Sequence, residues 1–388
     1  MNNLEAQLKQ TARDKGAVTA GIASRERLLQ SPPSANPDYL LPSTQSAISF
    51  AVAIDQQVLR RSLSREAWLE HGEELKRVQQ RLYAIGDRLV DLLVEHGFDA
   101  FAVDGNDTYR PQEDVTDPLL MTKFVPDFSH RYGAVAAGLG RLGWSGNLLT
   151  PEHGATIILG TVLTSATLEP DPMMEDNQCD GCKLCTSVCP IEMISPRESV
   201  EVVVAGIREV IGRKQPDSQC WISCGGYQGL HKGGKWSNWS PYRVTKAIPE
   251  DKQGLDSMLI ELRKKDPEEH QEISPFSDYR ATTFDPNWRF VAACGNCANI
   301  CWERREDRVE NRQLLVKSGQ VVLRPNGLRE PASEEIVEVN TPLGVKAAVL
   351  KDEYERGEFA RLSPSDAVGY THMDTEVLRH LAATAPRP

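Results

Sequence analysis

Four closely spaced cysteines followed by a proline are the residues with the most distinctive chemistry. They are Cys179, Cys182, Cys185 and Cys189, in the pattern C-x2-C-x2-C-x3-C-P. Three thiolates on one tight turn can reach three corners of a small iron–sulfur cube, whereas the fourth points toward a neighbouring cube. This spacing is typical of a [4Fe-4S] ligand set. C-x2-C pairs also bind zinc, but four cysteines so close together suit a cluster better.

A second cysteine run lies much further along the chain. It consists of Cys294, Cys297 and Cys301, in the pattern C-x2-C-x3-C. By pseudo-symmetry, Cys301 completes the first cluster, and Cys189 joins Cys294 and Cys297 at a second one. The second cluster then lacks one ligand, which either Cys220 or Cys224 must supply.

The cysteines are confined to one part of the chain. None of the nine lies in the first 178 residues or in the last 87. Disulfides are rare in a reducing cytosol, so clustered thiols in that compartment favour metal binding.

Length and composition set the class of protein. The chain has 388 residues, is 40% hydrophobic and 26% charged, and carries a formal net charge of −11. These values exclude a disordered chain or a collagen-like repeat and argue against binding nucleic acid by bulk charge alone. No apolar run approaches the roughly 20 residues of a membrane span, and the start resembles no signal peptide. We therefore expect a cytoplasmic protein with no membrane contact.

Hydrophobic periodicity predicts the elements that must position the cysteines. Short apolar runs at 47–54 and 155–164 indicate buried strands, and residues 58–97 indicate a long amphipathic helix or helix pair. Residues 1–30 show helical spacing, and 104–117 form a polar loop. Together they predict an α/β or α+β domain of about 170 residues.

Three further segments carry weaker signals. Residues 231–243 mix basic and aromatic side chains, which could cover a cofactor, stack on a planar substrate or meet a nucleic acid, or else pack their tryptophans on the cysteine region. The run 304–308 is charge-mixed and predicts a solvated helical face. Residues 334–354 alternate like a strand pair around 341–344, and a short helix is expected from about Asp374.

A resemblance to a known family joins these segments. Residues 136–154 (AAGLGRLGWSGNLLTPEHG), then G-T-V-L-T at 160–164 and the cysteine run, resemble the core of the epoxyqueuosine reductase and reductive dehalogenase superfamily. The match covers roughly residues 15 to 305. It implies an α+β fold: a nitroreductase-like α/β corrinoid-binding domain (1–170), a ferredoxin-like 2[4Fe-4S] domain (171–310) with an insertion at about 202–290, and a strand-rich C-terminal extension (311–388).

The same resemblance implies the cofactors. These are two [4Fe-4S] clusters and a base-off cobalamin held between the first two domains. The corrinoid would be approached by Gly138, Gly140, Gly143, Gly146 and Asn147, since glycine allows close approach to a flat macrocycle. The alternative for the glycines is tight helix–strand packing without a ligand. Cys220 occupies the place of the family's isolated cysteine ligand, which favours it over Cys224.

Departures from the family pattern bear on the substrate. The family's D-x-A-P-x-x-E-R stretch reads FVPDFSHR at 124–131, and Trp144 stands where those enzymes have Lys. The C-terminal helical repeats with which epoxyqueuosine reductases bind tRNA are also missing. Candidate proton donors become Asp127, His130 and Tyr132. By resemblance to dehalogenases, Tyr132 could act with Arg131 or Lys123 as its supporting basic residue.

We therefore expect a cobalamin- and iron–sulfur-dependent reductase that removes oxygen or halogen from a small or medium organic substrate. Its electrons would come from an external low-potential donor of the ferredoxin or flavodoxin type. Epoxyqueuosine reduction in tRNA is a disfavoured variant. A ferredoxin-type electron-transfer protein without corrinoid is the alternative from another class.

Overall fold

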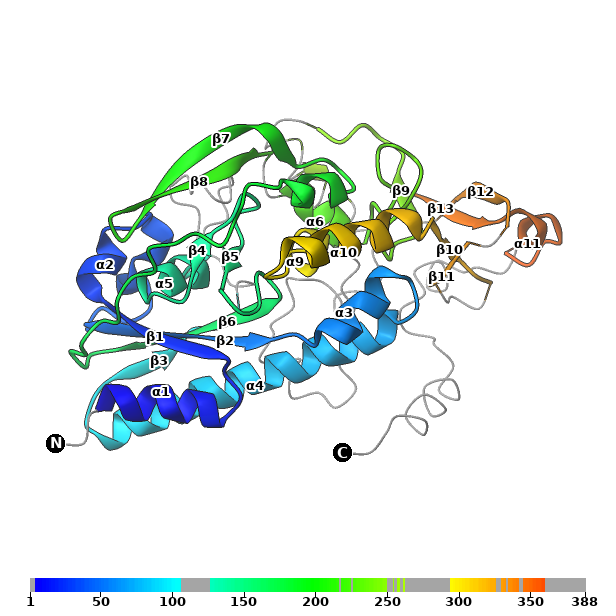
Figure 1. The fold of residues 1–388 in the computed structure, drawn as a ribbon. Helices are drawn as coiled ribbons and strands as arrows, with labels where there is room; N and C mark the ends of the chain where they lie inside the picture. Colours follow the sequence, from blue (N-terminus) through cyan, green and yellow to red (C-terminus); the bar gives the residue numbers. More distant parts are fainter. Residues whose placement is uncertain are drawn as a thin grey trace.

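The computed structural model describes residues 4–105, 126–249 and 294–359, apart from 216–217, 225, 326–328, 333 and 342–344, and also residues 254, 257, 258 and 261. The loop expected at 104–117, beyond its first two residues, and the helix expected from Asp374 lie outside these described residues. Helices and strands are mixed along the chain (Figure 1).

A four-stranded antiparallel sheet forms the centre of the N-terminal part. Its order is β1 (Thr19–Ser24), β2 (Ser46–Ala53), β6 (Ile157–Thr164) and β3 (Ala100–Ala102). The strands β2 and β6 confirm the two buried strands predicted at 47–54 and 155–164. They pair along their whole length, from Ser46 opposite Thr164 to Ala53 opposite Ile157.

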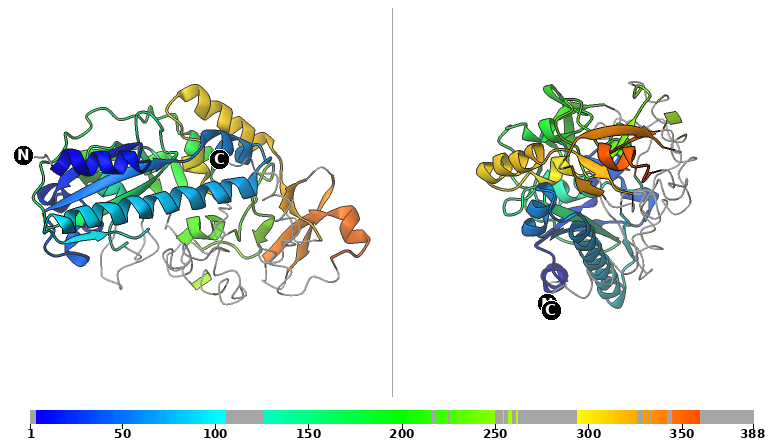
Figure 2. Two further views of the ribbon diagram at one scale, coloured as in Figure 1. Left: turned by 90° about the horizontal axis from the view of Figure 1, so that it is seen from below. Right: turned by 90° about the vertical axis from the view of Figure 1, so that its right-hand side faces the viewer.

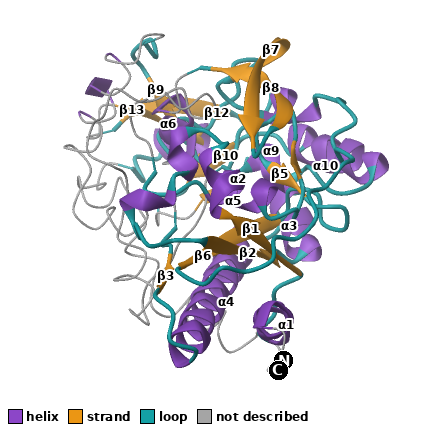
Figure 3. Cartoon of the chain, turned by 90° about the vertical axis from the view of Figure 1, so that its left-hand side faces the viewer, coloured by secondary structure: helices purple, strands orange, loops and turns teal. Residues whose placement is uncertain are grey.

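Alternation along β2 gives the sheet two buried faces, because successive side chains point to opposite sides. Phe50 and Ile48 pack with helices α1 (Leu4–Asp14) and α4 (Trp68–Glu95), whereas Ala47 and Ala51 pack in a second core with α2 (Arg25–Leu29) and α5 (His130–Ala136). Figure 3 shows the long helices on one side of the sheet and α2 and α5 on the other.

The amphipathic stretch 58–97 is a helix pair, α3 (Gln56–Leu63) followed by α4. Asp55 caps α3 by accepting hydrogen bonds from the backbone N–H groups of Gln57 and Val58. The turn between the helices contains Arg65, whose φ of 70° lies in the left-handed region. Residues 1–30 are less uniform than their helical spacing predicts, since β1 separates α1 from α2.

A long hairpin not predicted from the sequence covers the second core. It consists of β7 (Ile194–Val204) and β8 (Ile207–Lys214) and runs along the top in Figure 1. Its inward-facing Val202, Val204 and Ile211 are buried with residues of α5. The hairpin therefore holds the segment after the cysteine run against the N-terminal sheet.

The C-terminal segment confirms the strand pair predicted at 334–354, as β12 (Ile336–Asn340) and β13 (Val345–Leu350). Strand β9 (Tyr242–Val244), from the expected insertion, pairs with β13 in the same sheet. Strands from both sides of residue 310 thus share one sheet and one core, at the right-hand end of Figure 1 and of the left view of Figure 2.

Short elements complete the described fold. They are η1 (Pro33–Ala35), η2 (Pro37–Tyr39), β4 (Arg141–Leu142), β5 (Leu148–Leu149), η3 (Leu184–Val188), α6 (Ser218–Cys224), α9 (Asn296–Asn299), α10 (Arg305–Lys317), β10 (Val321–Leu323), β11 (Arg329–Pro331) and α11 (Lys351–Glu355). None of the helices within the described ranges has the length and apolar character needed to span a bilayer.

Candidate metal centre

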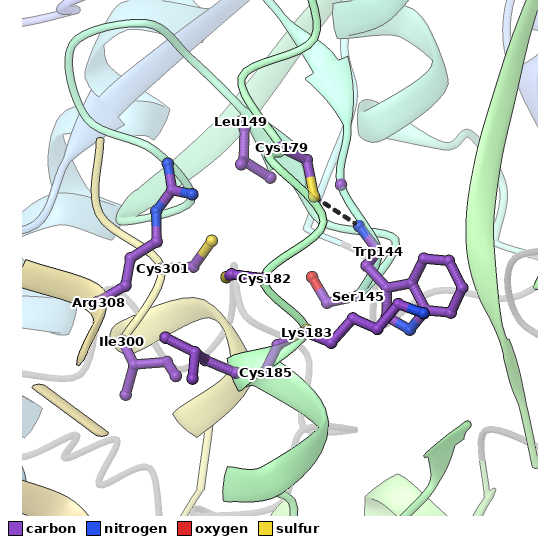
Figure 4. A pocket seen from close by; sticks show the side chains of 12 residues that line it. Trp144, Ser145, Leu149, Cys179, Cys182, Lys183, Cys185, Ile300, Cys301 and Arg308 are labelled. Atoms are coloured by element: carbon purple, nitrogen blue, oxygen red, sulfur yellow. Dashed lines mark hydrogen bonds between the residues drawn. The ribbon is translucent and has the colours of Figure 1, made fainter. Parts of the chain in front are cut away.

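Four cysteines converge on one pocket, as the sequence predicted for the first cluster. This first cysteine group consists of Cys179, Cys182, Cys185 and Cys301, and Trp144, Lys183 and Arg308 also line the pocket. Three of the thiols come from the segment that enters η3, and Cys301 follows α9 (Figure 4). The pocket brings together the two cysteine runs that are most distant in the sequence.

The turn that presents the first three thiols is shaped by its polar residues. Asn177 accepts a hydrogen bond from the backbone N–H of Cys179 at 2.8 Å, and Asp180 accepts one from that of Cys182 at 3.0 Å. Gly181 and Lys183 have positive φ values of 68° and 56°. These local bonds hold the thiols on a tight turn, which is the geometry that the spacing predicts.

The remaining five cysteines form a second cysteine group. Burial is the main cause of the raised pKa of Cys189, and electrostatic repulsion from Cys294 adds to it. Burial is also the main cause that raises the pKa of Cys297 to about 11, and repulsion from Cys220 and Cys294 adds to it. Cys224 lies 3.4 Å from Cys220, sulfur to sulfur. The nine cysteines therefore lie in two groups, and their assignment as cluster ligands stays a prediction.

The two cysteine groups adjoin one another. After burial, the first cause of the raised pKa of Cys185 is repulsion from Cys297, which belongs to the second group. Across residues 4–105, 126–249 and 294–359, no three His, Cys, Asp or Glu side chains converge closely enough to hold a single metal ion. The first group instead surrounds a pocket, and its all-sulfur donor set fits a [4Fe-4S] cluster.

Two buried guanidinium groups lie close to the cysteine groups. Arg308 is 3% exposed; burial raises the pKa of Cys301 to about 12, and the guanidinium of Arg308 opposes that rise. It donates to Asp180 at 3.1 Å and to the carbonyl of Trp302 at 2.5 Å. The prediction of a solvated face at 304–308 is therefore wrong for Arg308, because Asp180 and a backbone carbonyl hold its side chain inside the protein.

Arg65 is the second of these cations. It is 6% exposed, donates to the carbonyl of Ser237 and lies over the ring of Trp239, 5.2 Å from its centroid. Burial lowers the pKa of Arg65 to about 9, and the neighbouring Cys294 opposes that shift. Its position in the turn between α3 and α4 gave no signal in the sequence.

The glycine-rich loop, residues 138–147, runs between the cysteine groups. The backbone N–H of Trp144 donates to Cys179 Sγ at 3.3 Å, and Asn147 Nδ2 donates to Cys297 Sγ at 3.6 Å. A Cβ atom at Gly143 would lie 3.5 Å from the Cβ of Cys179. Gly146 has a φ of 75°, so it turns the loop between these two contacts. The loop therefore supplies one hydrogen bond to a sulfur of each group.

Two of the glycines predicted to hold a corrinoid are closely packed against the protein's own backbone. A Cβ at Gly138 would lie 2.2 Å from the carbonyl oxygen of Pro172, and one at Gly140 would lie 2.1 Å from that of Leu149. Gly138 and Gly140 therefore fit the alternative of tight packing within the protein. Neither offers a macrocycle free space at its α-carbon.

The three candidate proton donors lie on and before α5 and do not line the cysteine pocket. Tyr132 is fully buried in the second core, whereas Asp127 is half-buried. His130 Nε2 donates to the carbonyl of Asp104 at 2.8 Å, and Nδ1 contacts Thr161 Oγ1 at 3.0 Å. Burial lowers the pKa of His130 to about 4, so its imidazole is neutral near pH 7. These contacts hold the imidazole of His130 in place inside the protein.

The tryptophans of 231–243 are packed inside the protein. Trp236 is buried with Ile300 and Val188, and Trp239 donates from Nε1 to the carbonyl of Ser62 at 2.9 Å. Trp239 also stacks on Trp68 with ring centroids 5.8 Å apart. The packing alternative for this segment is therefore the one observed.

Fold and site together define a mixed α/β protein with two adjoining groups of free cysteines. Its sequence relates it to the epoxyqueuosine reductases, which confirms the resemblance. One from Synechococcus sp. (strain RCC307) is 30% identical over 217 residues, 48% of this chain and 60% of that protein. One from Bacillus cereus is 26% identical over 169 residues, 40% of this chain and 37% of that protein. The chain thus matches less than two thirds of either relative's length.

The similarity of the chain to known families and solved structures is weaker than its similarity to these two relatives. No family model matches the chain. Solved structures that overlap with it include an epoxyqueuosine reductase bound to an epoxyqueuosine-modified tRNA stem loop, with a TM-score of 0.35, 19% identity and coverage of 59% of this chain and 58% of that one. A catabolic reductive dehalogenase overlaps with a TM-score of 0.41, 16% identity and coverage of 56% and 28%.

Proposed function

We propose that the chain is a reductase that carries two [4Fe-4S] clusters, one on each cysteine group. The observation that carries this proposal is the pair of N–H···S bonds from Trp144 and Asn147, which join both groups to one loop. Each cluster, when bound, would accept and release single electrons. Donors to the sulfurs stabilise the more negative reduced state, so this loop would tune both groups.

The charged residues support the same role. Ligand thiolates buried in a low-dielectric interior need nearby positive charge. Arg308 supplies it beside the first group, and Lys214 supplies it beside Cys297. Arg65 lies on the Cys294 side of the second group. The fold therefore places one or more cations near each set of ligands.

The substrate class is a proposal that rests on the family resemblance and on the departures from the family pattern. We propose reductive removal of oxygen or halogen from a small or medium organic molecule, with electrons from a low-potential carrier of the ferredoxin or flavodoxin type. Tyr132, Asp127 and His130 stay candidate proton donors. Cobalamin is an expectation from the resemblance alone, since Gly138 and Gly140 pack against backbone carbonyls and do not form an open binding surface.

Epoxyqueuosine reduction in tRNA is the second candidate function. The names of the sequence relatives favour it. The replacement of the family's Asp donor stretch by FVPDFSHR at 124–131, together with Trp144, counts against it. Incubation of the reduced protein with an epoxyqueuosine-containing tRNA stem loop separates the two: queuosine formation supports the tRNA activity and its absence supports a smaller substrate.

Metal analysis of anaerobically reconstituted protein tests the core of the proposal. We expect about eight irons and eight sulfides per chain, since two [4Fe-4S] clusters require them. Cys179→Ser and Cys294→Ser should each remove about half of that iron. Zinc in place of iron would overturn the proposal. Retention of added cobalamin through gel filtration would support the corrinoid enzyme, whereas a cluster spectrum alone would favour an electron-transfer protein.

A further inference from the structure

The second cysteine group has one thiol more than a cluster can use. A [4Fe-4S] cluster takes four cysteine ligands. The group contains five sulfurs, from Cys189, Cys220, Cys224, Cys294 and Cys297. The surplus lies on helix α6, which carries Cys220 and Cys224.

The two helical cysteines are neighbours in space. They are four residues apart, so both thiols point from the same face of the helix. Their sulfur atoms are 3.4 Å apart, which is hydrogen-bonding distance for sulfur. Either one can therefore approach a given ligand position with a small rotation of its side chain.

Their other neighbours differ. Cys220 packs with Cys189 and Cys297 around Met193 and Ile191, on the side of the group where these two prospective ligands lie. Cys224 makes its other side-chain hydrogen bond with Cys294. Cys220 is therefore positioned to act as the fourth ligand. Cys224 contacts the sulfur atoms of Cys220 and of Cys294, another prospective ligand.

Helix α6 is held firmly in this position. Ile222 is fully buried in the core shared with the C-terminal strands. Ser223 donates to the carbonyl of Gln228 at 3.0 Å, and Asn238 donates to the Ser223 hydroxyl at 3.1 Å. The helix backbone thus keeps both thiols near the metal site.

We infer that Cys224 is a reserve ligand of the second cluster, an inference that rests on the proposed iron–sulfur function. In the resting arrangement its S–H group donates a hydrogen bond to the Cys294 sulfur. In the exchanged arrangement the iron–sulfur bond to Cys220 breaks, the bond to Cys224 forms, and the proton of Cys224 passes to the Cys220 sulfur. Total charge and iron oxidation state are unchanged, so no oxidant or reductant is needed.

Iron content of four variants of the full chain tests this inference. They are Cys220→Ala, Cys224→Ala, the double variant, and Cys189→Ala as a matched control, because the cysteines that surround Cys189 are themselves prospective ligands. Each is reconstituted anaerobically, and iron is counted per chain. The electron paramagnetic resonance signal of the first cluster serves as the control for folding.

We expect Cys220→Ala to keep the full iron content, and Cys189→Ala and the double variant to lose about half. Cys224→Ala should keep its iron. The reduction potential of its second cluster should be lower, because an S–H donor to a ligand sulfur is lost. Loss of half the iron in Cys220→Ala would overturn the reserve role. Loss in Cys224→Ala with none in Cys220→Ala would overturn the assignment of Cys220. An iron-free unmodified chain would instead refute the proposed function.

Discussion

Arg141 Nε donates to Glu209 Oε1 at 2.7 Å, in an ion pair whose carboxylate is fully buried. The same carboxylate accepts hydrogen bonds from the backbone N–H of Leu142 at 3.2 Å and from Asn177 Nδ2 at 3.4 Å. Arg141 and Leu142 belong to the glycine-rich loop, Glu209 to the hairpin, and Asn177 to the turn before Cys179. One side chain therefore joins three segments around the first cysteine group.

Removal of that carboxylate should destabilise the protein severely. Glu209→Ala leaves Arg141, whose side chain is only 12% exposed, without its ion-pair partner, and breaking a buried pair costs about 3 to 5 kcal/mol. Chemical denaturation should detect the loss. Glu201→Ala, which breaks an exposed pair with Arg208 on the same hairpin, serves as control and should cost under about 1 kcal/mol. Equal unfolding midpoints for the two variants would contradict the central role of Glu209.

The amide of Asn147 should tune one cluster and not the other. Asn147→Leu removes the N–H···S bond to Cys297 while keeping a similar side-chain volume. Without that donor the reduced state is less stabilised, so the second cluster should be reduced at a lower potential. A redox titration followed by electron paramagnetic resonance resolves the two clusters. An unchanged second cluster, or an equal shift in both, would refute the assignment.

Two buried histidines should make stability depend on pH. Burial lowers the pKa of His71 and of His130 from 6.5 to about 4. Between these values the unfolded chain binds protons that the folded chain does not. Stability is therefore complete above pH 6.5 and falls toward pH 4, by up to about 3 kcal/mol for each histidine.

Denaturation midpoints measured from pH 7.5 to pH 4.5 check this dependence. His71→Gln and His130→Gln should each flatten the curve, whereas His96→Gln, at an exposed position, should leave it unchanged. A curve of the same steepness in all three variants would show that other groups cause the acid sensitivity.

Arg308 should be required for loading of the first cluster. Arg308→Ala removes a buried cation from a pocket wall formed by four cysteines, together with its bond to Asp180. We expect about half the iron to be lost. Arg305 provides a close comparison, since it also pairs with Asp180, at 3.0 Å, but is exposed. Arg305→Ala should retain full iron, and equal loss in both variants would trace the effect to Asp180 alone.

Much of the fold could be predicted where periodicity is strong. The runs at 47–54 and 155–164 are mostly apolar and carry no charge, which predicts buried strands, and residues 58–97 repeat their apolar positions at helical spacing. The spacing of the cysteines also led us to expect Cys301 beside Cys179, Cys182 and Cys185, and these four line one pocket. These features depend on residues that are near one another in the sequence.

What escaped prediction depends on distant partners. The sequence from 194 to 214 contains valines among charges, and only the second core decides that Val202 and Val204 face inward. Arg308 stands in a charge-mixed run, and its burial depends on Asp180, far earlier in the chain. Glu209 carries no local signal, because its partners Arg141 and Asn177 come from separate segments.

The composition of the first cysteine group bears on how the protein matures in the cell. Cys185 and Cys301 line the same pocket but are separated by the whole hairpin and insertion. Closing so long a loop costs entropy, which binding of the proposed cluster would have to offset. The fourth cysteine of the group is synthesised more than a hundred residues after the third, so a cluster on this group could be completed only late in translation or after it.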